Sequence, residues 1–263
     1  MTIASEAALS PIVYFTDQKQ GVALMQFIDP RPMPAPSETS VILIAKQIRK
    51  MHDGKSFEPW KTLDEILDYF YQLLSPPVRS AEVMKKCMAE LSYFKKYLND
   101  AADVRPSHGD LNPGNVLFDG TPYLFVDWFS ASPQNLYFDL ATCAQLFYFS
   151  NEELCSSLLT NYLGHEAAQD ELAKYFLMRI FMNIYYGMML MASAHGAGVE
   201  LKTLSDDEIR GLPGFAEYHR LIGAGEVKLE AAEARRKFGF VFLNNAVAEV
   251  EGEKYRELKK HAL

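Results

Sequence analysis

The chain has 263 residues, a formal net charge of −8 and 49% hydrophobic residues, a composition typical of a globular protein. Its 26 Lys and Arg against 34 Asp and Glu argue against a nucleic-acid partner, because binding to phosphate backbones relies on positive charge. The three cysteines lack Cys-x-x-Cys spacing, so the sequence predicts reduced thiols in a cytoplasmic protein and no metal cluster. The first ten residues lack the basic start of a secretory signal.

The N-terminal part contains two short apolar segments, 12–15 and 22–27, which are predicted strands joined by the polar turn 17–21. The segment 29–36 holds four prolines and is predicted to be a stiff, extended linker. We expect the exposed edge of these strands to be covered by a second copy of the chain, forming a homodimer. The alternative is that residues 1–9 fold back as a short extra element and the chain stays monomeric.

From residue 37 onward the apolar spacing predicts mostly helices. A helix is expected over 41–51 before Gly54, and the capping box Thr62–Glu65 opens another that ends before Pro76. The further predicted helices cover 80–99, 140–149, 151–163 (capped by Ser150 and Glu153), 166–194 and 242–261. The longest apolar stretch, 175–194, contains Arg179 and Asn183, which favours a buried helix over a membrane span.

The residues with the clearest chemistry lie between these helices, on a loop that follows Pro106. Asp110 and Asn115 are five residues apart on a segment that Gly109, Pro113 and Gly114 keep tight. Two predicted strands, 116–118 and 123–126, follow, joined by an Asp-Gly turn. Such a hairpin returns Asp127 to the side of Asn115. Phosphoryl transfer from a nucleotide needs a base for the attacking hydroxyl and oxygen ligands for Mg²⁺, and these residues supply both.

The series His-Gly-Asp at 108–110, Asn115, Val-Asp-Trp at 126–128 and Asp-Leu-Ala at 139–141 resembles the aminoglycoside phosphotransferase and choline kinase family. The resemblance implies an α+β, protein-kinase-like fold. It places a remnant of the small β lobe and the hinge at 1–36, and a mainly helical C-terminal lobe with the catalytic hairpin at 37–263. The implied activity is ATP- and Mg²⁺-dependent phosphorylation of a hydroxyl group on a small molecule, choline- or ethanolamine-like or aminoglycoside-like.

The same resemblance implies a role for each site residue. Asp110 is the catalytic base, His108 orients the loop, and Asn115 and Asp127 hold Mg²⁺. Asp139 braces the catalytic loop, with the alternative that it caps the next helix. The hinge residues are Gln26, Phe27 and Ile28, and their backbone contacts the adenine. His52 is a hydrogen-bonded core residue.

The acceptor is implied to contact Tyr185 and Tyr186, although aromatic residues at helical spacing are more often core residues. Choline kinase relatives usually have Glu where this chain has Phe129, which weakens a strict choline kinase assignment. The sequence before Pro11 contains no Gly or Lys, so the family's glycine-rich loop and strand lysine are absent. Three explanations remain open: a late start or fragment, a catalytically impaired ligand-binding protein, and an enzyme that holds ATP through the hinge and metal site.

Overall fold

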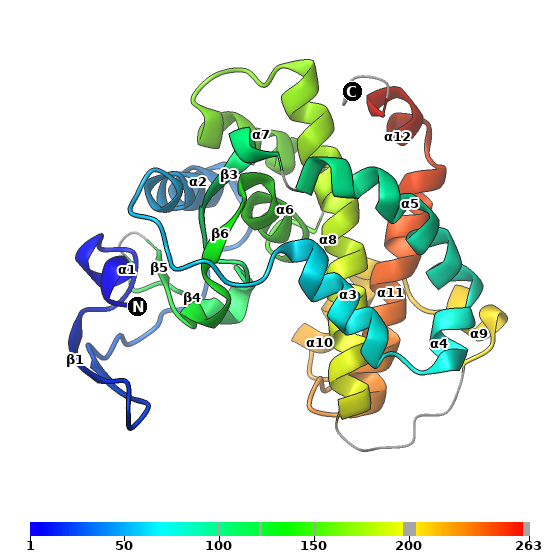
Figure 1. Cartoon of the computed structure of the whole chain (residues 1–263), viewed down its shortest axis with the longest axis horizontal. Helices are drawn as coiled ribbons and strands as arrows, with labels where there is room; N and C mark the ends of the chain where they lie inside the picture. Colours follow the sequence, from blue (N-terminus) through cyan, green and yellow to red (C-terminus); the bar gives the residue numbers. More distant parts are fainter. Residues whose placement is uncertain (99, 121–122, 150, 197–203, 260–263) are drawn as a thin grey trace. The chain divides into compact units, whose positions relative to one another are not determined.

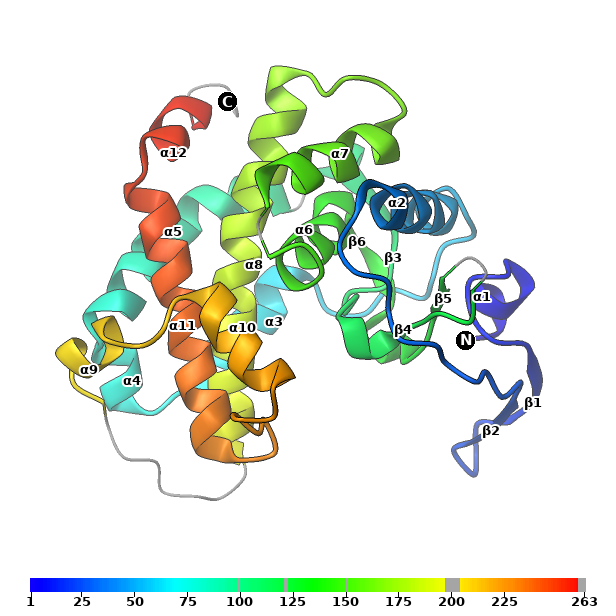
Figure 2. The same ribbon diagram turned by 180° about the vertical axis from the view of Figure 1, so that it is seen from behind.

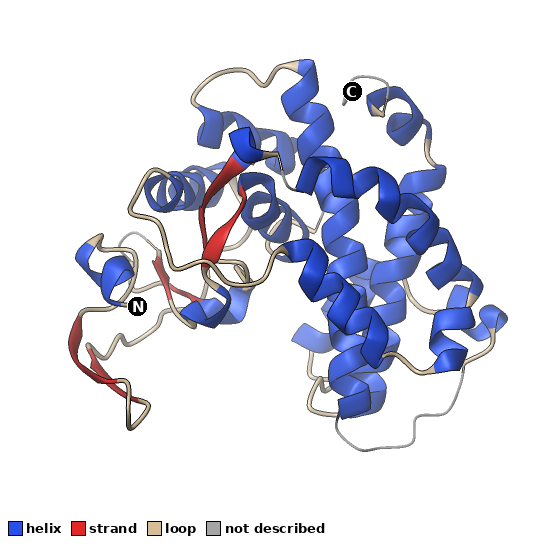
Figure 3. Cartoon of the chain, viewed as in Figure 1, coloured by secondary structure: helices blue, strands red, loops and turns tan. Residues whose placement is uncertain are grey.

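The computed structural model describes residues 1–98, 100–120, 123–149, 151–196 and 204–259. The chain folds into two compact units that each combine two stretches of sequence. Unit 1 contains Met1–Trp60 and Asn99–Ala168, and unit 2 contains Lys61–Leu98 and Gln169–Leu263. Every described strand belongs to unit 1, whereas unit 2 is helical (Figure 3). The predicted α+β class is confirmed, and the predicted division at residues 36 and 37 stays a prediction.

In its described residues, unit 1 contains three two-stranded antiparallel sheets. The predicted N-terminal strands pair as β1 with β2, and the predicted hairpin after the loop forms as β4 with β5. The sequence did not predict the third pair, β3 with β6, because Pro106 pairs with Pro133 and β6 has few β-forming residues. The strands are β1 (Val13–Asp17), β2 (Val22–Met25), β3 (Val104–Ser107), β4 (Val116–Leu117), β5 (Leu124–Phe125) and β6 (Ser132–Asn135).

The larger helices of unit 1 are α2 (Glu38–His52), α6 (Leu136–Leu146) and α7 (Glu152–Leu163). A serine capping box starts α2, since the Ser37 side chain accepts from the Ser40 N–H and the Ser40 side chain accepts in return. One face of α2 is buried, and α7 packs against this helix (Figure 2). All residues of α6 are buried, so this helix forms the centre of unit 1.

The N-terminus forms a short helix, α1 (Thr2–Glu6), as the fold-back alternative predicted. The Ser5 hydroxyl oxygen accepts from the Val13 N–H at 2.9 Å, which ties α1 to the start of β1. The Leu9 carbonyl accepts from the Phe125 N–H at 2.7 Å, so residue 9 lies beside β5, and the Leu9 side chain is buried. The N-terminal segment is therefore anchored to the hairpin β4–β5.

Unit 2 is built around two long helices, α8 (Gln169–Gly196) and α11 (Ala232–Glu251), which lie side by side (Figures 1 and 2). Two glycines bring their backbones together, since a Cβ at Gly239 would lie 2.7 Å from the Gly187 carbonyl oxygen. The helix α8 is long and apolar enough to cross a membrane, but 83% of its most apolar window is buried inside the protein. This burial agrees with the predicted core helix.

The remaining helices of unit 2 correct several predictions. The capping box Thr62–Glu65 starts its helix as predicted. The predicted helix 242–261 begins instead at Ala232 and is interrupted at Gly252. Two short helices after residue 204 were not predicted, because each spans fewer than three turns and gives little periodic signal. The remaining helices are α3 (Leu63–Leu73), α4 (Pro76–Ser80), α5 (Glu82–Leu98), α9 (Asp206–Arg210), α10 (Phe215–Gly223) and α12 (Glu253–Leu258).

Two predicted helix caps in unit 1 also need correction. The helix α6 is capped by Asn135, whose side chain accepts from the Tyr137 N–H, so the alternative role of Asp139 as its cap is wrong. The helix α7 is capped by Asn151, whose side-chain oxygen accepts from the Leu154 N–H. The other predicted cap, Ser150, lies outside the described residues. Asn and Ser both favour this position, so the sequence could not separate two adjacent candidates.

Candidate active site

The loop between β3 and β4 places the carboxylate of Asp110 against two amide side chains. The Asn112 Nδ2 donates to Asp110 Oδ1 at 3.0 Å. The Asn115 Nδ2 donates to the Asp110 carbonyl oxygen at 2.9 Å and to Asp110 Oδ2 at 3.1 Å. Because the Asn115 nitrogen faces Asp110, its Oδ1 is the atom of that amide available to bind a cation. Asn112 was not among the site residues predicted from the sequence, although Asn-Pro-Gly is a recognised turn signal that could have identified it.

The hairpin β4–β5 returns the chain to the loop at Asp127. The Val126 N–H donates to the Asn115 carbonyl oxygen at 2.9 Å, so the residue before Asp127 is bonded directly to Asn115. Asp127 has φ 58° and ψ 67°, a left-handed conformation that is uncommon outside glycine. Its side chain is exposed, unlike that of the following Trp128. Backbone strain of this kind is concentrated at functional sites.

His108 is buried beneath the loop and is held in one tautomer. Its Nε2–H donates to the Val126 carbonyl oxygen at 2.9 Å, and its Nδ1 accepts from the Asp110 N–H at 3.3 Å. Burial lowers the pKa of His108 although Asp139 and other carboxylates nearby act to raise it. The ring is therefore neutral at neutral pH, and its two nitrogens connect the start of the loop to the end of the hairpin.

Asp139 supports the loop from the fully buried side. Its Oδ2 accepts from the His108 N–H at 2.9 Å, and its Oδ1 accepts from the Gly109 N–H at 3.0 Å. The His52 Nε2–H donates to Asp139 Oδ2 at 3.1 Å, and the His52 Nδ1 bonds to the Tyr162 hydroxyl at 2.8 Å. Burial by itself would raise the pKa of Asp139, but the hydrogen bonds from His52 and His108 hold this pKa below its ordinary value.

Gly109 allows the loop to pack closely on the turn that follows Asp127. It has φ +77°, and a Cβ at this position would lie 2.6 Å from the Ser130 carbonyl oxygen. Any side chain here would therefore move either the loop or the 3-10 turn Trp128–Ser130. The packing places residues 109–115 and 127–130 in one cluster within unit 1.

The oxygen donors of this cluster fit Mg²⁺ better than a transition metal. The two residues predicted as ligands, Asn115 and Asp127, offer one amide oxygen and one exposed carboxylate. Within the described ranges, no group of three or more His, Cys, Asp or Glu side chains could hold a metal ion. Mg²⁺ keeps several waters and is typically bound by one or two carboxylates together with substrate phosphates. The donor set is therefore compatible with a magnesium–nucleotide complex.

The predicted hinge also belongs to unit 1. The Gln26 N–H donates to the Ile12 carbonyl oxygen at 2.7 Å, which extends the pairing of β1 and β2 by one bond. Phe27 is 85% exposed, and within the described part of the chain no backbone hydrogen bond involves Phe27 or Ile28. Further on, the Arg31 N–H donates to the Phe118 carbonyl oxygen at 2.7 Å, which attaches the proline-rich linker to the hairpin β4–β5.

The two tyrosines predicted to contact the acceptor belong to unit 2. Both lie on α8 and are buried. The ring of Tyr185 meets that of Phe70 edge to face with centroids 5.5 Å apart, and the ring of Tyr186 stacks on Phe242 at 5.9 Å. These contacts are those of core residues, as the alternative interpretation predicted. A role in binding the acceptor stays a prediction.

An exposed aromatic pair next to the loop was also missed. Trp60 and Phe129 have ring centroids 5.6 Å apart, and Phe129 is 80% exposed two residues after Asp127. The Trp60 N–H donates to the Ser132 hydroxyl at 3.0 Å, which fixes this residue beside the turn. The Asp-Trp-Phe series places Phe129 next to the loop, but its partner Trp60 is distant in the sequence, so the pair could not be predicted.

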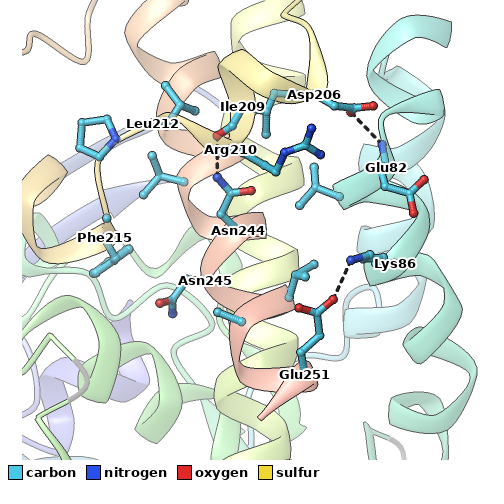
Figure 4. A pocket seen from close by; sticks show the side chains of 16 residues that line it. Glu82, Lys86, Asp206, Ile209, Arg210, Leu212, Phe215, Asn244, Asn245 and Glu251 are labelled. Atoms are coloured by element: carbon cyan, nitrogen blue, oxygen red, sulfur yellow. Dashed lines mark hydrogen bonds and ion pairs between the residues drawn. The ribbon is translucent and has the colours of Figure 1, made fainter.

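Two cavities in the structure do not include any of the predicted site residues. One of about 400 Å³ lies in unit 2 between α5, α9, α10 and α11 (Figure 4). In its lining, Lys86 binds Glu251 at 2.6 Å, and the backbone N–H of Glu82 donates to the Asp206 carboxylate. The other, of about 190 Å³, lies in unit 1 beside the linker and the end of α6. Neither cavity carries the chemistry of the loop.

Comparison with solved structures shows the same fold in several kinases. A choline/ethanolamine kinase family protein from Mesorhizobium loti is 16% identical, with a TM-score of 0.70 over 99% of this chain and 81% of that one. The choline kinase LicA from Streptococcus pneumoniae is 14% identical, with a TM-score of 0.60 over 92% and 77%. An ethanolamine kinase from Plasmodium vivax is 15% identical, with a TM-score of 0.59 over 97% and 71%.

These likenesses establish the protein-kinase-like fold that the sequence predicted. No curated protein sequence matches the chain. A family model described as the phosphotransferase enzyme family, APH, matches residues 4–175, which include the whole loop, the hairpin β4–β5 and Asp139. Because this match covers more than half of its length, the chain belongs to the phosphotransferase enzyme family.

Proposed function

We propose that the chain is an ATP- and Mg²⁺-dependent phosphotransferase that phosphorylates a hydroxyl group of a small molecule. The observation that carries this proposal is the loop geometry: a carboxylate fixed by two amides, an amide oxygen beside it, and a second, exposed carboxylate delivered by the hairpin. Membership of the phosphotransferase family supports the same activity. The structure of LicA in complex with AMP, a protein with this fold, supports the use of a nucleotide.

The proposed roles follow from the contacts of each side chain. Asp110 would accept the proton of the acceptor hydroxyl as that oxygen bonds to the terminal phosphorus of ATP, while the bond from this phosphorus to the bridging oxygen breaks and ADP leaves. Asn115 Oδ1 and the Asp127 carboxylate would hold Mg²⁺, which when bound neutralises charge on the nucleotide phosphates. His108 is neutral and fully engaged in hydrogen bonds, so it positions the loop and does not act as the base.

The nucleotide and acceptor contacts are proposed on other grounds. We propose that the adenine binds at the exposed hinge, where it contacts Gln26 and the backbone groups of Phe27 and Ile28. Tyr185 and Tyr186 are proposed to contribute the wall of the acceptor site, following the family resemblance. The solved relatives of the same fold are named as choline or ethanolamine kinases, so amino alcohols are the first acceptors to test, followed by aminoglycosides.

The activity test uses the purified chain with ATP, Mg²⁺ and a panel of choline, ethanolamine and aminoglycosides, with phosphorylated product measured directly. We expect Asp110→Asn to lower kcat by about 10²–10⁴-fold, the range that general base catalysis contributes. ATP binding should survive in Asp110→Asn and weaken in Asp127→Asn, since only the latter removes a proposed magnesium ligand. Asp119→Asn, which changes a carboxylate in the turn of the same hairpin, is the matched control and should retain activity.

Two results would contradict this mechanism in different ways. Phosphorylation that persists in Asp110→Asn would exclude Asp110 as the base. Binding of a panel compound without any phosphorylation by the wild-type chain would favour a ligand-binding protein that retains the family's loop. We also propose that the protein works in the cytoplasm, where its three buried thiols would stay reduced.

A further inference from the structure

The cavity of about 400 Å³ in unit 2 combines a buried apolar lining with an exposed charged one (Figure 4). Its size lies in the range of about 300–1,000 Å³ that is typical of small-molecule pockets. None of the residues proposed for the active site lines it. The helices α5, α9, α10 and α11 each contribute one buried apolar side chain: Val83, Ile209, Phe215 and Val241. The cavity therefore offers apolar contact area to a ligand that is not the phosphate acceptor.

The exposed part of the lining carries both signs of charge. Among the described residues that line the cavity, five are charged: Glu82, Lys86, Asp206, Arg210 and Glu251. A ligand with only negative charge would meet three carboxylates, and one with only positive charge would meet two cations. A neutral ligand that carries one charge of each sign can place each charge beside its opposite. The lining thus favours a zwitterion.

Two cations are placed to bind the negative group of such a ligand. In Figure 4 the Arg210 guanidinium and the Lys86 amine both lie between α5 and α11. Arg210 binds Asp207 at 2.5 Å, and Lys86 binds Glu251 at 2.6 Å. All four side chains are substantially exposed, and such surface pairs contribute little to stability. Either cation can therefore exchange its partner for a ligand carboxylate, and a guanidinium binds a carboxylate through two parallel hydrogen bonds.

Acceptors for a positive group lie beside these cations. The hydrogen bond to Glu251 raises the pKa of Lys86, and the charge of Glu82 adds to this rise. The charge of Arg210 opposes it, so these groups lie within electrostatic reach of one another. Asn244 Nδ2 donates to a backbone carbonyl of α9 at 2.7 Å, which leaves its Oδ1 as an acceptor. A carboxylate and an amide oxygen are therefore available to bind an ammonium group.

We propose that this cavity binds a small zwitterion with an apolar body, of the class of α-amino acids with large apolar side chains. The carboxylate of the ligand binds Arg210, with Lys86 beside it. The ammonium group donates to Glu82 and to Asn244 Oδ1, and the side chain covers the buried apolar lining. Because the ligand binds only the folded chain, it also raises the stability of unit 2.

The experiment uses calorimetry of the purified whole chain, without nucleotide or phosphate acceptor, and four probes. Phenylalanine carries all three groups, whereas glycine lacks the apolar side chain, hydrocinnamate lacks the ammonium group and phenethylamine lacks the carboxylate. We expect saturable binding of phenylalanine. Each of the other probes should bind at least about tenfold more weakly, because burial of an aromatic side chain and hydrogen bonds to charged groups each contribute that much.

Two variants connect the binding to the cavity. Arg210→Gln removes the proposed carboxylate contact, and Glu82→Gln removes the charge opposite the ammonium group. Each should weaken phenylalanine binding at least about tenfold and reduce the rise in melting temperature that phenylalanine causes. Both side chains are exposed, so the fold should remain, and circular dichroism checks this. The matched control is Arg220→Gln, which changes an exposed arginine of α10 that is paired with Glu217 and lies outside the cavity lining.

Each outcome decides the proposal. A lack of saturable phenylalanine binding up to about 10 mM would overturn it. Equal affinity for hydrocinnamate, phenethylamine or glycine would also overturn it, because one of the three contacts would then be absent. So would an unchanged affinity in either cavity variant, or an equal loss in Arg220→Gln. A preference for phenylalanine that only the two cavity variants weaken would support it. None of these readouts depends on phosphotransferase activity, so the proposed function is tested separately.

Discussion

Asp139 is the residue on which the loop geometry depends most directly, and Asp139→Asn tests this dependence without changing side-chain size. The carboxylate is completely buried and accepts three hydrogen bonds, from the His108 N–H, the Gly109 N–H and the His52 Nε2–H. Two of these donors are backbone groups of the loop itself. Removal of the charge therefore acts on the position of the loop as well as on the stability of unit 1.

The expected loss of unfolding free energy follows from the number of N–H groups that donate to Asp139. The Asn amide oxygen can replace Oδ2 and keep the bonds to His108 and His52, but its NH₂ group then faces the Gly109 N–H, donor against donor. Each buried group left without a partner costs about 1–3 kcal/mol, and two groups are affected. We expect the free energy of unfolding of unit 1 to fall by about 2–6 kcal/mol.

Tryptophan fluorescence during urea unfolding is a suitable assay, because both tryptophans of the chain, Trp60 and Trp128, lie in unit 1. The control is Asp53→Asn, which removes an exposed carboxylate whose contact with Arg49 lies on the surface of α2. Such a surface pair contributes about 0.3–0.5 kcal/mol. A loss of less than about 1 kcal/mol in Asp139→Asn would refute the reasoning, since it would show that the charge is not needed to hold the loop.

The pH dependence gives a second check on the same variant. The pKa of Asp139 is lowered on folding, so its stabilising contribution is present above the unfolded pKa of about 3.9 and is lost as the pH falls through the folded value. The difference in unfolding free energy between the wild type and Asp139→Asn should therefore be constant near neutral pH and shrink in acid. A difference that grows as the pH falls would contradict the assigned charge state.

Two further predictions concern the loop. Gly109→Ala should lower the unfolding free energy by more than Gly21→Ala. Both residues have positive φ, which costs about 1–2 kcal/mol for a residue with a side chain, but only a Cβ at Gly109 would meet a carbonyl oxygen at 2.6 Å. Equal losses of unfolding free energy in urea would refute this. Burial lowers the pKa of His108, so the unfolded chain binds a proton that the folded ring does not, and stability should fall as the pH drops below about 6.5. His108→Gln should reduce this slope in fluorescence-monitored unfolding, and an unchanged slope would count against the neutral ring.

Some features of this protein were determined locally and could be read from the sequence. The Asp-Gly turn between two apolar segments predicted the hairpin β4–β5, and the capping box at Thr62 predicted the start of α3. Turn and cap preferences act over a few residues, which is why they survive in any tertiary context. The spacing of Asp110, Asn115 and Asp127 predicted that the hairpin would bring the chain back to the loop, which the bond between Val126 and Asn115 shows.

Other features were decided only by the tertiary structure, because their partners are distant in the chain. The carboxylate of Asp139 accepts from His108 and from His52, which are 31 and 87 residues away in the sequence, and no local pattern specifies such a pair. The pairing of β3 with β6 opposes two prolines, so strand propensity argued against it. The close crossing of α8 and α11 requires Gly187 to meet Gly239, a match between two helices that neither helix reveals alone. Hydrogen-bond partners and close approaches depend on where the chain returns, and only packing of the whole unit determines that.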